Sequence, residues 1–200
     1  MVQTEVLNQF FLDHIGYRNA MLICCSLLID TMTLTSFYYW ARHSTSWRFL
    51  IAMGIFYSLR AFTTSLVIFE IPEGYNWAYP GIMSIFVPYG ATADFFYSGH
   101  VGTCILQMNE HLSESRPKHA LFCLFTMFCQ AFMMVALRSH YSIDMLAAMI
   151  FAHYIFIMSE RYCFIVDQYV FGNEKMPQQE IIVNCQNCDV TNQVRITREI

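Results

Sequence analysis

The chain has 200 residues, of which 56% are hydrophobic and only 13% are charged, and its mean hydropathy is +0.38. Soluble domains carry about 25% charged residues, so this composition is typical of an integral membrane protein and argues against a soluble domain. The net charge of −4 is small and lacks the basic excess of nucleic-acid-binding proteins. We therefore expect the lipid bilayer, and no nucleic acid, as a partner.

Five apolar stretches predict an all-α bundle of about five transmembrane helices, because a helix needs about 20 residues to cross the hydrocarbon core. The third stretch is short for a crossing. The predicted spans are 21–40, 49–69, Phe95 or Phe96 to 108, 120–137 and 141–159.

These spans divide the chain into three parts. Residues 1–20 are an interfacial N-terminal segment, too charged for a signal peptide. Residues 21–165 form the membrane domain. Its longest connection contains an apolar run, Gly81 to Val87, which is expected to dip into the interface. Residues 166–200 are a polar tail without apolar periodicity, in which Cys185 and Cys188 form a single C-x-x-C of undecided role; one such pair is weak evidence for zinc.

The distribution of basic residues predicts the orientation. One face, here called face A, carries only Arg18 and Arg138. The loops and tail on the other face, face B, carry eight basic residues: Arg42, Arg48, Arg116, Lys118, Arg161, Lys175, Arg195 and Arg198. The positive-inside rule then makes face B and the C-terminus cytosolic, and face A luminal or extracellular.

Two polar clusters stand at the starts of the third and fifth spans, which both begin on face A. The first runs from Asp94 to Ser98, Gly99 and His100, and the second contains His140 and Asp144. The spacing of His140 and Asp144 is one helical turn, so the two side chains are expected on one face of a helix. Ionisable groups at the ends of membrane spans are candidates for function.

The clusters suit phosphoryl transfer. A carboxylate beside His140 would orient the imidazole as a nucleophile, and His100 would act as general acid and then as general base. A phosphohistidine route requires neither a metal nor another cofactor. Ser98, Gly99 and the adjacent helix N-terminus could bind a phosphate, and Arg138 could hold one of its oxygens. At the depth of the headgroups, the natural substrate is a phospholipid.

Structural alternatives exist for several of these residues. His100, His140 and Asp144 could all be structural. Asp94 could cap the third helix, and Arg138 could anchor the chain at the interface. Arg60 could pair with Asp30 across consecutive antiparallel spans, which is favoured over a role in substrate binding. The aromatic cluster Tyr75 to Trp77 is expected to belong to an interfacial belt.

The two clusters resemble the catalytic motifs of the sphingomyelin synthases and ceramide phosphoethanolamine synthases, a branch of the lipid phosphate phosphatase superfamily. The resembling motifs are Asp94-x-x-x-Ser98-Gly99-His100 and His140-Tyr141-Ser142-x-Asp144. Similar segments upstream are Phe10 to His14, Arg48, and Tyr57-x-x-Arg60-x-x-Thr63. The resemblance covers residues 8–165. The family has six membrane helices, and the first has no counterpart here.

The resemblance implies that residues 21–165 are a catalytic domain. It implies transfer of a phosphocholine or phosphoethanolamine headgroup from a glycerophospholipid donor to a ceramide acceptor, with release of diacylglycerol. His140 would attack the phosphorus with help from Asp144, and His100 would exchange protons with the leaving and entering oxygens. Golgi, plasma membrane and endoplasmic reticulum all remain open as locations, as does a homo-oligomer.

Several positions depart from the family pattern. Thr92-Ala93 replaces Cys-Gly, Val101 replaces a threonine, Ser139 replaces a frequent acidic residue, and Val6 to Gln9 replaces Pro-Leu-Pro-Asp. Two alternatives therefore accompany the transferase. One is a lipid phosphatase or phospholipase C-like hydrolase, although the Lys-x6-Arg-Pro element of the dedicated phosphatases is absent. The other is a truncated, non-catalytic paralogue that binds lipid.

Overall fold

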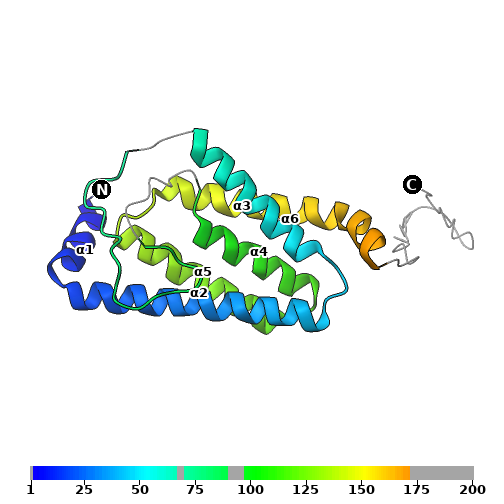
Figure 1. Ribbon diagram of the computed structural model, residues 1–200. Helices are drawn as coiled ribbons and strands as arrows, with labels where there is room; N and C mark the ends of the chain where they lie inside the picture. Colours follow the sequence, from blue (N-terminus) through cyan, green and yellow to red (C-terminus); the bar gives the residue numbers. More distant parts are fainter. Residues whose placement is uncertain (1, 67–69, 90–96, 172–200) are drawn as a thin grey trace, which may run out of the picture.

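The computed structural model of the protein describes residues 2–66, 70–89 and 97–171, and within these ranges it contains six α-helices and no strand (Figure 1). The expected all-α fold is therefore confirmed. The helices are α1 (Val2–Asp13), α2 (Ile15–His43), α3 (Arg48–Leu66), α4 (Gly99–Ser113), α5 (Pro117–Ala136) and α6 (Ser142–Phe171).

Four helices, α2, α3, α5 and α6, are long and apolar enough to cross a membrane. They correspond to the predicted spans 21–40, 49–69, 120–137 and 141–159. The boundaries differ at two ends, because α2 already begins at Ile15 and α6 continues to Phe171. These helices support an integral membrane protein.

The predicted third span, α4, is shorter than a membrane crossing. Its 15 residues extend about 22 Å at about 1.5 Å per residue, whereas the hydrocarbon core is about 30 Å thick. The helix packs against α2, α3, α5 and α6, and most of its residues are buried. Its neighbours therefore shield α4 from lipid, and it forms the centre of the bundle.

The packing of α3 on α4 depends on a glycine. A Cβ atom at Gly102 would overlap the ring of Phe56, which is fully buried. We expect Gly102→Ala to lower the free energy of unfolding by about 1–3 kcal/mol, as overpacking does. The matched control is Gly54→Ala on α3, where a Cβ meets nothing within 4 Å. Alanine favours a helix by about 1 kcal/mol over glycine, so thermal unfolding in detergent should separate the two variants in opposite directions.

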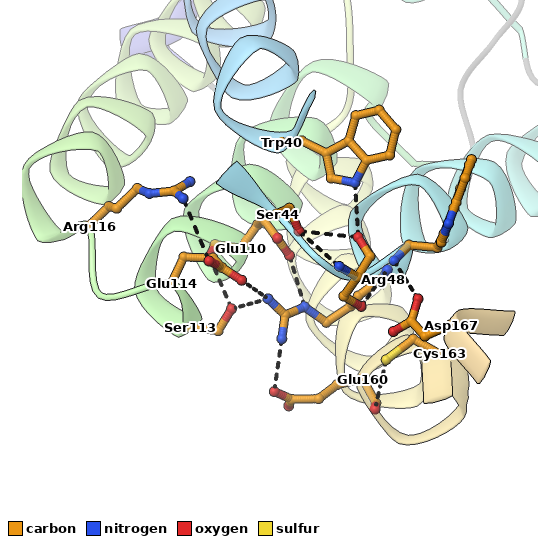
Figure 2. A network of polar contacts seen from close by, with 12 residues as sticks. Trp40, Ser44, Arg48, Glu110, Ser113, Glu114, Arg116, Glu160, Cys163 and Asp167 are labelled. Carbon is orange, nitrogen blue, oxygen red and sulfur yellow. Dashed lines mark hydrogen bonds and ion pairs between the residues drawn. The ribbon is translucent and has the colours of Figure 1, made fainter. Parts of the chain in front are cut away.

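An ion-pair network surrounds Arg48, where the start of α3 meets the end of α4 (Figure 2). Arg48, the first residue of α3, contacts the Oε2 atom of Glu110 through its Nε atom at 2.9 Å. Its Nη2 atom donates to the Oγ atom of Ser113 at 2.6 Å, and further ion pairs reach Glu114 at 3.3 Å and Glu160 at 3.4 Å. One guanidinium thus joins α3 to the end of α4 and to α6.

Arg48→Met is expected to be strongly destabilising. The Arg48 and Glu110 side chains are 11% and 6% exposed, so the variant leaves a buried carboxylate without its cation, which costs about 3–5 kcal/mol. Glu160→Gln is the control, because this side chain is 53% exposed and such exposed pairs contribute about 0–1 kcal/mol. Equal melting temperatures for the two variants would contradict the importance of the Arg48–Glu110 pair.

Candidate active site

The starts of α4 and α6 are joined at one end of the bundle. The backbone N–H of Ser98, the N-cap residue of α4, donates to the carbonyl oxygen of Asp144 in the first turn of α6 at 3.2 Å. Both residues are buried. The structure thereby brings together the Ser98–His100 segment and the His140–Asp144 segment, which are about forty residues apart in the sequence.

The His140–Asp144 contact forms in a different way from the predicted one. Because α6 begins at Ser142, His140 lies in the loop before the helix and not on its face. The contact still exists, with 3.4 Å between the Nδ1 atom of His140 and the Oδ2 atom of Asp144. The same oxygen accepts the backbone N–H of Tyr141 at 3.0 Å, as an acidic residue does when it reaches back from the first turn to cap a helix.

This arrangement orients the imidazole of His140. The side chains of His140 and Asp144 are 9% and 5% exposed, so the carboxylate faces the Nδ1 atom in a largely dry environment. The distance exceeds the usual length of about 3 Å, and catalytic hydrogen bonds are often long before substrate binds. An Nδ1–H donated to Asp144 leaves the lone pair on the Nε2 atom.

His100 lies in the first turn of α4 with its ring packed edge-to-face on Trp77, at a centroid distance of 5.5 Å. Both of its ring nitrogens are buried, and neither has a hydrogen-bond partner among the described residues. Buried polar atoms are normally paired, so the exception requires a reason. His140 and Arg60 interact electrostatically with His100, and the bond from Ser98 to Asp144 joins the two segments that carry the imidazoles.

Arg60 reaches this place from α3. Its Nε atom donates to the carbonyl oxygen of Tyr97 at 3.2 Å. A Cβ atom at Gly99 would lie only 3.0 Å from the Cζ and Nη1 atoms of Arg60. The absence of a side chain at Gly99 therefore allows the guanidinium to lie against the start of α4, where the helix dipole already favours an anion.

The predicted pair between Arg60 and Asp30 is wrong. The Asp30 carboxylate accepts hydrogen bonds from Ser84 Oγ, Ile85 N and Phe86 N at 2.8, 3.0 and 3.1 Å. The physical reason is the path of the connection between α3 and α4, which folds back onto α2 and supplies donors that the sequence pattern could not place. Arg60 is thus positioned for the role that the sequence analysis considered second, next to the candidate site.

Arg138 fixes the loop that carries His140. It has a positive φ of 50° and follows α5 in a Schellman arrangement, in which the N–H of Ser139 donates to the carbonyl of Met134 at 3.1 Å. A left-handed conformation costs a non-glycine residue about 1–2 kcal/mol. The Nη1 atom of Arg138 donates to the carbonyl of Glu73 at 3.0 Å, so this guanidinium contacts the α3–α4 connection.

The residues that cover the site were not predicted from the sequence. Trp77 was predicted to be an interfacial residue, but it is only 7% exposed and donates its Nε1–H to the carbonyl of Pro88 at 3.1 Å. Asn8 of α1 donates to the carbonyls of Gly74 and Ala136 at 3.0 and 3.1 Å. These hydrogen bonds hold the α3–α4 connection in place, with Trp77 against His100. No periodic pattern in the sequence predicts this arrangement.

Two groups of predicted residues lie outside the described part of the chain. Asp94 belongs to the first group, together with Thr92 and Ala93, and the pair Cys185 and Cys188 is the second.

Residues 92–161 match the family model described as PAP2 superfamily C-terminal. The matched range contains both histidine segments. The match supports the lipid phosphate phosphatase superfamily. Members of this superfamily are typically phosphatases or phosphotransferases, which agrees with the chemistry of two imidazoles and a carboxylate. No curated protein and no solved structure matches the chain.

Proposed function

We propose that the protein transfers a phosphocholine or phosphoethanolamine headgroup from a glycerophospholipid to ceramide and releases diacylglycerol. The observation that carries the proposal is the bond from the Ser98 N–H to the carbonyl of Asp144, which joins the two histidine segments. On one side His140 is oriented by Asp144, and on the other the buried ring nitrogens of His100 have no partner in the described residues. This pair lies at the starts of α4 and α6, the end of the bundle that the topology predicts to lie at the depth of the lipid headgroups.

In the first step, the Nε2 atom of His140 attacks the phosphorus of the donor, and the bond from phosphorus to the diacylglycerol oxygen breaks. A protonated His100 gives its proton to that oxygen. The product on the enzyme is a phosphohistidine that carries the headgroup. The positive charge on the ring of His140 is stabilised by Asp144, whose Oδ2 atom faces Nδ1 at 3.4 Å.

In the second step, the now neutral His100 takes the proton from the hydroxyl of ceramide. The ceramide oxygen attacks the phosphorus, the nitrogen–phosphorus bond breaks, and His140 is restored. Phosphate oxygens would be held by Ser98, the N–H groups at Gly99 and after, and Arg60 beside them. Arg138 is a further candidate of the same kind. Asp94, an acceptor, is a predicted site residue that could act only indirectly on the phosphate, by orienting one of these donors.

Burial of the site favours transfer over hydrolysis. Trp77 covers His100, and a site that excludes water protects a reactive intermediate. The hydrolase alternative uses the same two histidines with water as the acceptor, and the Lys-x6-Arg-Pro element of dedicated phosphatases is absent from the sequence. We also propose that the site faces the lumen or the cell exterior, so that a tag on Ile200 is accessible only from the cytosol.

The decisive experiment supplies fluorescent ceramide and phosphatidylcholine or phosphatidylethanolamine to vesicles that contain the purified full chain. A fluorescent sphingolipid that carries the donor headgroup supports the transferase. Soluble phosphocholine or phosphoethanolamine without that lipid supports the hydrolase. Binding of ceramide without any turnover supports the non-catalytic alternative.

A further inference from the structure

Asp30 is a carboxylate inside a predicted membrane span, and the reaction does not use it. It is 8% exposed and occurs near the middle of α2. A buried carboxylate is costly unless donors surround it. Here the hydroxyl of Ser84 and the backbone N–H groups of Ile85 and Phe86 supply three hydrogen bonds, and Ser84 in turn accepts the N–H of Val87 at 3.0 Å.

The contacts of the α3–α4 connection with α2 define its depth. At the start of α2, the Nη1 atom of Arg18 donates to the Oδ1 atom of Asn76 at 2.8 Å. Farther along the connection, the ring of Phe86 stacks on Phe37 with a centroid distance of 6.5 Å. The backbone of the connection reaches Asp30, to which the N–H of Phe86 donates. Asp30 follows Arg18 by about 18 Å along the axis at about 1.5 Å per residue. The backbone thus reaches the interior of a hydrocarbon core about 30 Å thick, and the Phe86 ring extends farther.

The chain then turns back toward the face from which it came. Tyr89 bonds through its hydroxyl to Ser26, which precedes Asp30 in α2, and its ring stacks on Trp77 at 5.8 Å. The connection therefore descends along α2 and returns to the candidate site. Figure 1 shows its trace running alongside α2.

The side chains at the deepest part of this path point outward and are apolar. Ile82, Met83 and Ile85 are 54%, 84% and 70% exposed. Such exposure in water would be costly for three neighbouring apolar residues. At this depth beside a transmembrane helix, however, the surroundings are acyl chains.

We propose that residues 79–89 form a re-entrant segment that inserts into the bilayer beside α2, presents Ile82, Met83 and Ile85 to lipid acyl chains, and is anchored by Asp30. Non-helical backbone is tolerated at membrane depth only where its polar groups are satisfied within the protein. Asp30 accepts the backbone N–H groups where the segment is deepest. This role explains why a charged residue lies within the membrane span. The proposal depends on the membrane bundle and not on the reaction.

The segment also contacts the cover of the candidate site. Its returning limb carries Tyr89 against Trp77, and Trp77 lies on His100. Asp30 is thus a positioning residue that acts on the site only through this cover.

Photolabelling of the wild-type chain tests the insertion directly. The protein is reconstituted in phosphatidylcholine vesicles containing a phosphatidylcholine with a diazirine in its acyl chain, irradiated, digested and analysed by mass spectrometry. We expect label on residues 82–85 at a level within about threefold of Leu27 and Leu34, which are exposed on α2, and no label on Glu73. Labelled Leu27 and Leu34 with unlabelled 82–85 would overturn the proposal.

Hydrogen exchange in the same vesicles tests the anchor. In Asp30→Ala, the amides of Ile85 and Phe86 should exchange at least tenfold faster than in the wild type, while amides in α5 keep their protection. Asp30→Asn retains a carbonyl acceptor and should fall between the two, which also provides a readout if the alanine variant does not fold. Unchanged exchange at residues 85 and 86 in a folded variant would rule out Asp30 as the anchor.

Discussion

His140→Ala is expected to abolish headgroup transfer, with a loss of at least about 10⁴-fold, because removal of a nucleophile eliminates the covalent route. The fold should survive. His140 precedes α6, and the cap of that helix is the bond from the Tyr141 N–H to Asp144, which the substitution leaves in place. The measurement is formation of fluorescent sphingolipid by wild type and variant at equal protein concentration.

His153→Ala provides the matched control for this variant. His153 lies in α6, is exposed, and contacts Asn109 through its ring Nδ1 atom at 3.3 Å. We expect its activity to stay within about twofold of the wild type, as surface substitutions seldom disturb the protein. Transfer by folded His140→Ala at a rate similar to that of His153→Ala would show that another residue is the nucleophile.

Periodicity and length were sufficient to predict the bundle. The apolar stretches predicted five spans, and four of them are helices of crossing length, namely α2, α3, α5 and α6. The parity of the spans then placed the Ser98–His100 and His140–Asp144 segments at one end, which the bond from Ser98 N to Asp144 O bears out for the described chain. Both inferences depend on regular structure, whose geometry is known in advance.

The remaining features depend on tertiary context. The length of α4 was compatible with a short span, and only its packing against four helices shows that protein and not lipid surrounds most of it. The connection from 70 to 89 has no repeating pattern, so its descent along α2 could not be predicted. For the same reason Asp30 was assigned to Arg60, which was the only opposite charge that helix geometry made available.

The start of α6 shows another limit of prediction from the sequence. The spacing of His140 and Asp144 suggested two residues on one helical face, whereas the helix starts after His140. The pair survives because a side chain in the first turn of a helix can reach back to the residues that precede it. The residue types therefore predicted the contact between His140 and Asp144, but they did not predict the local structure that makes it.

His100→Gln is expected to slow transfer from a natural glycerophospholipid by about 10²–10⁴-fold, the usual contribution of general acid–base catalysis. Glutamine keeps a polar side chain of similar reach, but it cannot carry a proton between the two oxygens. The decisive comparison uses a second donor, p-nitrophenyl phosphocholine, whose leaving group departs as p-nitrophenolate and does not need a proton. With this donor, the first step of His100→Gln should be nearly as fast as in the wild type.

The second step of the reaction distinguishes a catalytic role of His100 from a purely structural one. Attack by ceramide still requires a base, so His100→Gln should release one equivalent of p-nitrophenolate in a burst and then stop, with the headgroup held on His140 as an acid-labile, base-stable adduct. The double variant with His140→Ala should show no burst. If His100→Gln instead loses the same factor with both donors, His100 supports the packing under Trp77 and does not transfer protons. A burst that depends on His140 would assign the nucleophile and the acid–base group to the two imidazoles separately, and addition of ceramide or water would then identify the natural acceptor.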